Sequence, residues 1–182
     1  MKKRVAFLCS GLGNISRGFE TSTDNWFNAI KNDKELSVKL FSGGRHKNAT
    51  RVWNIRRHGK TAAILKKLNL IKNALRFEKI TFSIGFLFYL FIYRPQVIWL
   101  QELVLGDRLL AYKKYLRFNY KIIFCDGAPH GYWAAQRFDY IVFLHQKPMD
   151  DALDNGVPKE KCFLIPYLVK PAGETIKKET FW

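Results

Sequence analysis

The sequence has little negative charge for its size. Its 182 residues include 31 Lys and Arg but only 15 Asp and Glu, which gives a formal net charge of +16. A surplus of this size favours anionic partners such as nucleic acid, acidic lipid headgroups or phosphorylated small molecules. The length suffices for one well-formed core but not for two large domains.

Cysteine is also scarce. Cys9, Cys125 and Cys162 are far apart along the chain, so no two of them have the spacing of a metal knuckle, and an odd number makes a poor disulfide framework. Each cysteine lies at the end of an apolar run, which predicts buried thiols in a reducing compartment. We therefore expect a cytoplasmic protein without a metal site.

No apolar run is long enough to cross a membrane. The longest, residues 80–93, has 14 residues and includes Thr81, Ser83 and Gly85. A spanning helix needs about 20 residues, so this run predicts a buried or interfacial helix. The run at residues 5–9 ends at once in Ser-Gly, is too short for a signal-peptide core and predicts a first strand.

Strands and helices alternate along most of the chain. Continuous apolar runs predict strands at residues 4–9, 36–41, 97–100, 121–125, 140–144 and 163–166. Helical spacing predicts helices at about 17–32, 107–118 and 148–155. This alternation predicts a single Rossmann-like α/β domain, a mostly parallel sheet with helices on both faces, over residues 1–171. Residues 172–182 are polar and predict a tail or the start of an interdomain linker.

A basic and aromatic helical segment, residues 45–94, interrupts this alternation. Residues 45–79 hold 11 Lys or Arg and one acid, Glu78, and apolar side chains recur at helical spacing from Ile64 to Leu75. A basic helix beside exposed aromatics is typical of an interfacial membrane element. A core helix beside a solvated one is an equal alternative, and nucleic-acid binding is disfavoured because the aromatics are not spaced as stacking platforms. His46 and His58 are expected at the surface.

A glycine-rich loop joins the first strand to the first helix. Its dinucleotide fingerprint is incomplete, because Ser16 stands where the third glycine would be and no acid ends the second strand. NAD and FAD are therefore disfavoured. Gly11, Gly13, Asn14 and Arg17 still lie at the carboxyl end of a strand and before a helix, where an anionic ligand would be favoured. The alternative is a tight structural turn.

Two further candidates follow other strands. Asp126 and His130 lie in the tight loop 126–131, where they could hydrogen-bond a hydroxyl or orient a leaving group. The alternative is that Asp126 caps the next helix and His130 is solvated. Glu102 follows the strand 97–100 and could bind substrate hydroxyls, although a solvated loop acid is the commoner fate.

Taken in order, several segments resemble the N-terminal half of the family 4-like (group 1) glycosyltransferases of the GT-B architecture. The segments are residues 5–20, 94–99, 151–158 and 163–167. The resemblance runs from Lys3 to about residue 171. It implies retaining transfer of a sugar from a nucleotide-sugar to a glycan or lipid-linked acceptor, which this half mainly holds.

The resemblance also implies roles for the candidate residues. Gly11, Gly13 and Asn14 would face the cleft between two domains, with Arg17 and Glu102 also on the acceptor side. Asp126 and His130 would lie near the donor sugar as catalytic candidates. The nucleotide-sugar is a co-substrate, so no resident cofactor is expected, and the sequence has no Asp-x-Asp motif for a metal.

The nucleotide pocket and paired glutamates of the family belong to a second domain. We therefore expect this chain to be inactive without a donor-binding domain or partner chain, and to be cytoplasmic or peripheral on the inner face of a membrane. The alternative is a non-catalytic basic module that docks to a membrane surface or a partner protein. A nucleic-acid-binding protein is favoured by the charge alone.

Overall fold

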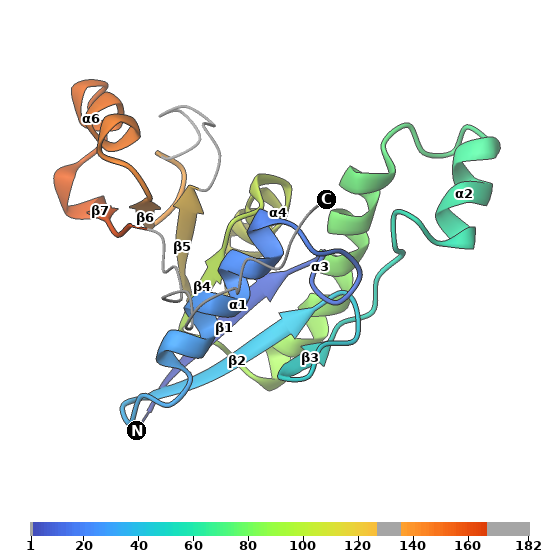
Figure 1. Cartoon of the computed structure of the whole chain (residues 1–182), viewed down its shortest axis with the longest axis horizontal. Coiled ribbons are helices and arrows are strands. Elements are labelled where there is room, and N and C mark those ends of the chain that lie inside the picture. Colours follow the sequence, from blue (N-terminus) through green and yellow to red (C-terminus); the bar gives the residue numbers. More distant parts are fainter. Residues whose placement is uncertain (1, 127–135, 167–182) are drawn as a thin grey trace, which may run out of the picture.

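The computed structural model describes residues 2–126 and 136–166. Seven parallel strands form one sheet in the order β3-β2-β1-β4-β5-β6-β7 (Figure 1). The strands are β1 (Lys3–Cys9), β2 (Leu36–Ser42), β3 (Ala49–Arg51), β4 (Val97–Leu100), β5 (Lys121–Asp126), β6 (Tyr140–Phe143) and β7 (Cys162–Leu164). The predicted Rossmann-like α/β fold is therefore confirmed.

Helices cover both faces of this sheet. The helices of the described residues are α1 (Gly18–Ile30), α2 (Lys60–Lys67), α3 (Ala74–Ile92), α4 (Leu103–Tyr115), α6 (Gln146–Asp154) and a 3-10 turn at Lys159–Lys161, and all but α2 adjoin the sheet. α1 packs on one face, while α3 and α4 pack together on the other (Figure 1). Strands buried on both sides explain why the apolar runs of the sequence show no polar alternation.

Two aromatic-rich cores hold these layers together. On the α1 face, the ring of Trp99 stacks on Phe7 at 5.5 Å and lies 4.9 Å from Trp26. On the α3 face, Phe82 and Phe86 are completely buried against the sheet. Each fully buried aromatic side chain contributes about 1.5–3 kcal/mol through the area that it removes from water.

The prediction of one continuous basic helix through residues 64–75 is wrong, because the helix is interrupted there. α2 ends at Lys67, and Asn69 has a left-handed φ of 54°. The side chain of Asn73 then accepts a hydrogen bond from the N–H of Arg76 and starts α3. An asparagine that caps a new helix competes with continuation of the old one, which explains the break.

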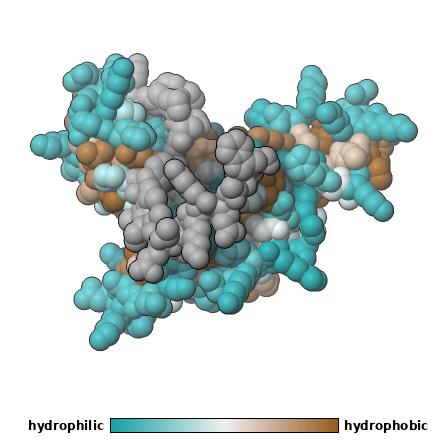
Figure 2. All heavy atoms as spheres, in the orientation of Figure 1, coloured by the Kyte–Doolittle hydropathy of each residue, from teal (hydrophilic) through white to brown (hydrophobic). Residues whose placement is uncertain are grey.

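The apolar stripe predicted on that helix faces solvent rather than a core. Ile64 and Leu68 are 59% and 61% exposed. α2 stands away from the sheet at one side of the molecule, where Figure 2 shows apolar surface among hydrophilic side chains. The aromatic segment is buried on one side only, because α3 buries Phe82 and Phe86 but exposes Phe88, and the membrane interface stays a prediction.

Smaller corrections concern element boundaries. β3 was not predicted, since Ala49–Arg51 has no apolar run; it is held through backbone pairing with β2. α4 begins four residues earlier than predicted, at Leu103. No helix in the described ranges has the length and apolar character needed to cross a membrane.

The expectation that the cysteines are buried thiols is confirmed. Cys9, Cys125 and Cys162 are free and buried. Burial raises the pKa of the Cys125 thiol to about 12 and also raises the pKa of Cys9. Thiols held in the protonated form are poor nucleophiles, so these residues are structural.

Candidate functional site

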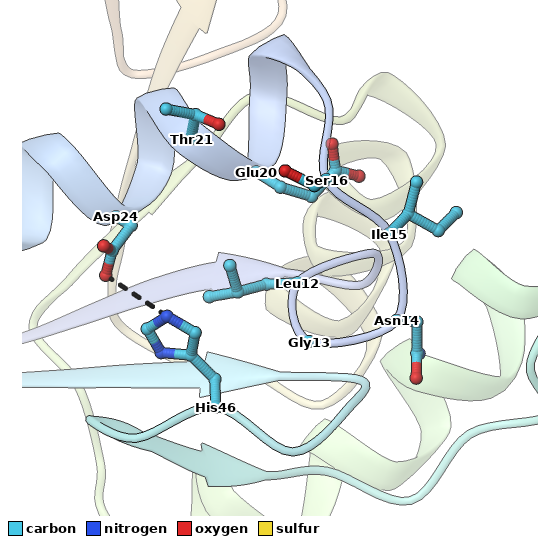
Figure 3. Close-up of a pocket in the computed structure, with 9 residues that line it drawn as sticks. All are labelled: Leu12, Gly13, Asn14, Ile15, Ser16, Glu20, Thr21, Asp24 and His46. Carbon is cyan, nitrogen blue, oxygen red and sulfur yellow. Dashed lines mark ion pairs between the residues drawn. The ribbon is translucent and has the colours of Figure 1, made fainter.

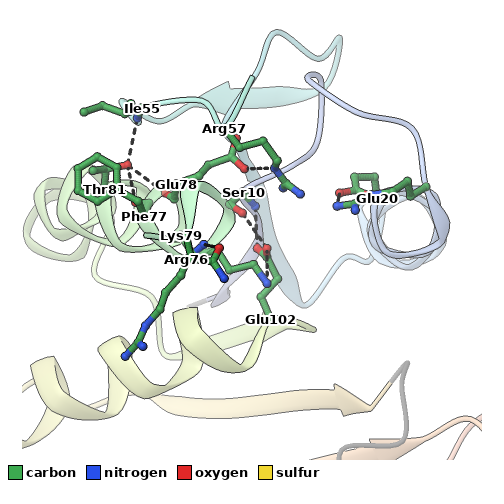
Figure 4. Close-up of polar contacts among 12 residues, drawn as sticks. Ser10, Glu20, Ile55, Arg57, Arg76, Phe77, Glu78, Lys79, Thr81 and Glu102 are labelled. Atoms are coloured by element: carbon green, nitrogen blue, oxygen red, sulfur yellow. Dashed lines mark hydrogen bonds and ion pairs between the residues drawn. The ribbon is translucent and has the colours of Figure 1, made fainter. Parts of the chain in front are cut away.

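The order in which strands are added to the sheet reverses between β1 and β4, which makes this the switch point of the sheet. β2 and β3 lie on one side of β1, and β4 to β7 lie on the other. Open parallel sheets bind ligands at the carboxyl ends of the strands beside such a switch point. Here Ser10, after β1, is joined to Glu102, after β4 (Figure 4). The Ser10 N–H and hydroxyl donate to the two Glu102 carboxylate oxygens at 2.8 and 2.7 Å. The ammonium of Lys79 lies 3.5 Å from the same carboxylate.

Glu102 is therefore not the solvated loop acid that is commonest at such positions. Its residue is only 7% exposed, and both carboxylate oxygens are engaged within the protein. It is also the residue before α4, so the early start of this helix brings Glu102 into the crevice. Glu102 therefore links the carboxyl ends of β1 and β4 at the switch point.

Close backbone packing requires the glycine at position 13 of the first loop. Gly13 has a φ of +78°, and a Cβ added there would lie 2.5 Å from the carbonyl oxygen of Arg45. A Cβ on Gly11 would lie 2.1 Å from a carboxylate oxygen of Glu20. The loop is tied to the turn after β2 by a 2.9 Å hydrogen bond from the Gly44 N–H to the Leu12 carbonyl. The tight-turn alternative thus accounts for Gly13, whereas Gly11 leaves space for the side chain of Glu20.

A cavity of about 480 Å³ lies on one side of this loop, and we call it the acidic hollow (Figure 3). It is lined by Leu12, Gly13, Asn14, Ile15, Ser16, Glu20, Thr21, Asp24 and His46. Asp24 and His46 face each other, with a carboxylate oxygen 3.6 Å from the imidazole Nε2. The volume is within the range of small-molecule sites.

Four buried polar atoms of the acidic hollow have no hydrogen-bond partner in the described part of the chain. They are Asn14 Nδ2, Glu20 Oε2, His46 Nδ1 and Asp24 Oδ1, of which Asp24 Oδ1 is the oxygen that lies 3.6 Å from His46 Nε2. Buried polar atoms in folded proteins are nearly always satisfied, because each unsatisfied one costs about 1–3 kcal/mol. A polar ligand in this hollow would satisfy them.

A second cavity, of about 230 Å³, lies on the other side of the same loop, and we call it the basic hollow. It is lined by Gly13, Asn14, Ile15, Arg56, Arg57, His58, Gly59 and Glu78. Arg57 Nε donates to Glu78 Oε2 at 2.5 Å, and both side chains are almost completely buried (Figure 4). Burial raises the pKa of Glu78, although the hydrogen bond from Arg57 opposes this shift.

The structure brings only some of the predicted residues together. Gly11, Gly13 and Asn14 form the loop between the two hollows. Arg17 precedes α1 with a half-exposed side chain, 3.4 Å from Glu20. Asp126 ends β5 on the same edge of the sheet. His130 lies outside the described residues, and the proposed roles of all these residues stay predictions.

Sequence reasoning missed the charged residues that line the two hollows. Glu78 did carry a signal, since it is the one acid in a basic stretch and precedes the buried Phe82 by four residues on the same helical face. His46 was expected at the surface, yet its side chain is only 23% exposed because it packs toward Asp24. Arg57 carried no signal, because nothing local distinguishes it from Arg56.

The described residues contain no group of three His, Cys, Asp or Glu side chains that could hold a metal ion. The three buried glutamates of the crevice are instead each associated with a cation of the protein. Glu20 lies beside Arg17, Glu78 beside Arg57 and Glu102 beside Lys79.

No protein-family description and no curated protein sequence matches this chain. Several solved structures share its fold. The lipopolysaccharide outer core galactosyltransferase WaaB superposes with a TM-score of 0.54 at 14% identity, over 87% of this chain and 44% of WaaB. MurG from Acinetobacter baumannii gives 0.51 at 9% identity, over 94% of this chain and 47% of MurG.

Sucrose-phosphate synthase from Thermosynechococcus elongatus superposes with a TM-score of 0.51 at 14% identity, over 91% of this chain and 48% of the synthase. The chain thus spans less than half the length of these three proteins. At such identities the likeness concerns the fold, which is the Rossmann-like fold of the GT-B glycosyltransferases.

Proposed function

We propose that this chain is the acceptor-binding, N-terminal half of a retaining glycosyltransferase that moves a sugar from a nucleotide-sugar to a glycan or lipid-linked acceptor. The observation that carries the proposal is the set of four unsatisfied polar atoms in the acidic hollow, beside the switch point. They include carboxylate oxygens that accept hydrogen bonds and an amide that donates them. Sugar hydroxyls both donate and accept, so they match such a set.

In this proposal, Glu20 and Asp24 accept hydrogen bonds from acceptor hydroxyls, and Asn14 donates one. The glycine-rich loop borders both hollows through Gly13, whose backbone packs closely against Arg45. Asp126 and His130 are proposed to lie near the donor sugar, as the family resemblance implies. The nucleotide-sugar is a co-substrate, and the proposal requires no resident cofactor.

We further propose that transfer needs a second, donor-binding domain, in the same polypeptide or in a partner chain. The coverage of less than half of WaaB and MurG supports this. Residues 1–171 are then the acceptor domain and residues 172–182 the approach to an interdomain linker. The product of a retaining enzyme keeps the anomeric configuration of the donor sugar, which nuclear magnetic resonance of the product would show.

The first experiment is to purify the protein from its own cells with any associated proteins. Transfer of radiolabelled sugar from a panel of nucleotide-sugars to an extract of cellular glycans and lipids is then compared with transfer by the 182-residue chain alone. We expect transfer only when a second Rossmann-like domain is present. Turnover by the isolated chain would contradict the division into halves.

Matched variants then test the acidic hollow. We expect Asp24→Asn to lower transfer by at least about tenfold, because a charged hydrogen-bond partner contributes about 1.5–3 kcal/mol. Asp154→Asn makes the same change at an exposed position at the end of α6 and should leave transfer unchanged. Equal activity of the two variants would remove the acidic hollow from the acceptor site.

We also propose that the protein docks on the inner face of a membrane through α2 and the outer side of α3. Ile84, Phe88 and Ile92 form an exposed stripe at helical spacing on α3. Apolar side chains beside a basic surface favour an interface with acidic headgroups. Flotation with phosphatidylglycerol vesicles, but not with phosphatidylcholine vesicles, is expected, and Phe88→Ser should weaken it; equal binding to both would contradict the proposal.

The alternative is a non-catalytic module that uses the same surface to dock to a membrane or partner. It is favoured by the exposed stripe and does not need the two hollows. Under this alternative, cells that carry Asp24→Asn or His130→Gln have unchanged glycans. Under the transferase proposal, the same cells lose the glycan that the enzyme makes.

A further inference from the structure

We propose that the basic hollow binds a phosphoryl group of the acceptor, an inference that rests on the acceptor-binding function proposed above and gives its substrate class. The hollow lies between the glycine-rich loop and residues 56–59. Three observations carry the proposal: a buried arginine with a free donor, an uncapped helix N-terminus and the charge balance of the lining.

The buried arginine is Arg57. Its side chain is 8% exposed, and its Nε is used by Glu78. Its Nη2 is buried and has no hydrogen-bond partner among the described residues. The amide nitrogen of Asn14, which lines the same hollow, is also buried and unsatisfied. Arginine presents its donors in a planar fork that matches the oxygens of a phosphoryl group.

The helix N-terminus is that of α2. Gly59 precedes the helix in an extended conformation (φ −83°, ψ 157°), and no side chain caps the first turn. Gly59 also lines the hollow. The first N–H groups of a helix have no partner within it, and the helix dipole favours an anion at this end. The first turn of α2 and the side chain of Arg57 therefore both border this cavity, with the Arg57 Nη2 on the side of Gly11.

The charges of the lining favour an anion with one protonated oxygen. Arg56 and Arg57 supply the cationic groups, His58 also lines the hollow, and Glu78 is the one acid of the lining. The second oxygen of Glu78 is buried without a partner. A phosphate monoanion offers charged oxygens to Arg57 and an O–H to Glu78, so it satisfies both groups.

The two hollows meet at Gly13–Ile15, which line both of them. A phosphoryl group in the basic hollow would hold the acceptor while its sugar hydroxyls reach Glu20 and Asp24. The same chemistry belongs to a soluble sugar phosphate and to a phosphorylated lipid. The structure assigns the phosphoryl group, and the test below separates these two sources.

The test is calorimetric titration of the whole chain with inorganic phosphate. We expect saturable binding that the variant Arg56→Gln/His58→Gln weakens by at least about tenfold, because the charged donor of Arg56 and the imidazole of His58 are removed. The matched control Arg108→Gln/His145→Gln makes the same changes at exposed positions of α4 and before α6. It should bind phosphate like the unmodified chain.

A second variant tests the buried arginine without leaving a lone charge. Arg57→Gln/Glu78→Gln removes both charges of the pair together, and its far-ultraviolet circular dichroism reports whether it folds. If it folds, we expect no measurable phosphate binding. Absence of saturable binding by the unmodified chain, or equal affinities of the Arg56→Gln/His58→Gln variant and its control, would overturn the proposal. No donor is needed, so these outcomes are independent of transferase activity.

Flotation with phosphatidylcholine vesicles that contain phosphatidic acid shows whether a lipid or a soluble molecule carries the phosphoryl group. If Arg56→Gln/His58→Gln floats less than its matched control, the phosphoryl group belongs to a lipid. If the two variants float alike but differ in phosphate affinity, the hollow takes a soluble phosphate ester. Both results support a phosphoryl site and differ only in what carries it.

Discussion

The parallel sheet has a charged cluster at each end of its strands, and the two clusters differ in how they use their polar atoms. At the carboxyl ends, Glu20, Glu78 and Arg57 each keep a buried polar atom without a partner among the described residues. At the amino ends, the carboxylate of Asp139 accepts from the ammonium of Lys113 at 2.8 and 3.0 Å and from the Ile122 N–H at 3.0 Å.

The amino-end cluster has the other attributes of a binding site. A cavity of about 430 Å³ adjoins Asp139 and is comparable to the acidic hollow of about 480 Å³. Lys113, Lys121 and Lys161 supply positive charge there. Cavity volume and charge therefore do not distinguish a ligand site from a structural network in this protein. The two clusters differ in their unsatisfied polar atoms, which gather around the two hollows, although Trp26 Nε1 and Trp99 Nε1 in the core are also without a partner among the described residues.

Substitution of Glu102 should have the largest effect among the tests of this distinction. Glu102 lies at the carboxyl ends of the strands, but its carboxylate oxygens have hydrogen-bond partners, like those of Asp139. Glu102→Ala would leave Lys79 without its buried partner and the Ser10 N–H without an acceptor. We expect a loss of about 3–5 kcal/mol in the free energy of unfolding, measured with urea. Glu160→Ala, at an exposed position, should change it by less than about 0.5 kcal/mol. If Glu102→Ala changed the free energy of unfolding by less than about 0.5 kcal/mol, Glu102 would belong to the ligand site rather than to a structural network.

Asp139→Asn tests the amino-end network and is expected to have an intermediate effect. The amide keeps the shape but weakens the contacts to Lys113, Lys121 and the Ile122 N–H. We expect a loss of about 1–3 kcal/mol at pH 7, measured in the same way. A loss below about 0.5 kcal/mol would show that this cluster is not a structural network.

The pH dependence of this loss is a separate prediction. Burial opposes ionisation of Asp139, but the hydrogen bonds from Lys113, Ile122 and Lys121 outweigh it and lower the pKa of the carboxyl. A lowered pKa in the folded state stabilises the protein above the ordinary Asp pKa of about 3.9, and this stabilisation is lost as the pH falls through the folded value. The difference between wild type and Asp139→Asn should therefore shrink below about pH 4. A constant difference would contradict this assignment.

Glu20→Gln should have the smallest effect on stability. One oxygen of Glu20 has no partner, and the other lies 3.4 Å from the half-exposed Arg17. Weak pairs of this kind contribute less than about 1 kcal/mol, so the free energy of unfolding should change by less than that. Acceptor binding should nevertheless fall. If Glu20→Gln destabilised the protein as much as Asp139→Asn, the two ends of the sheet would not differ as described.

The sequence predicted the fold well because the fold depends on local patterns. The central strands are continuous apolar runs, and the helices packed on them have apolar stripes, so element type followed from the chain itself. The failures were equally local. β3 has three residues and is held by its neighbour, and the break before α3 depends on a single asparagine cap.

The site was predicted less completely because it is made of contacts between distant residues. The glycine-rich loop was visible, since tight turns leave a compositional signal. Ser10 and Glu102 are 92 positions apart, and Arg57 and Glu78 are 21 apart. No periodicity or spacing reports such pairs. The residues of the acidic hollow therefore became apparent only when the chain was folded.

The strand order also has a consequence for how the protein folds. β1 is one of the two strands beside the switch point, and its partner β4 is paired 92 residues later in the register Val5↔Val97. Non-local pairings of this kind must close a long loop before they gain stability, which slows folding relative to helical proteins. During synthesis, β1, α1 and β2 can assemble as a local unit, whereas the bridge from Ser10 to Glu102 must await about 100 residues of chain. The same feature that gathers distant residues into one crevice thus makes that crevice a late product of folding.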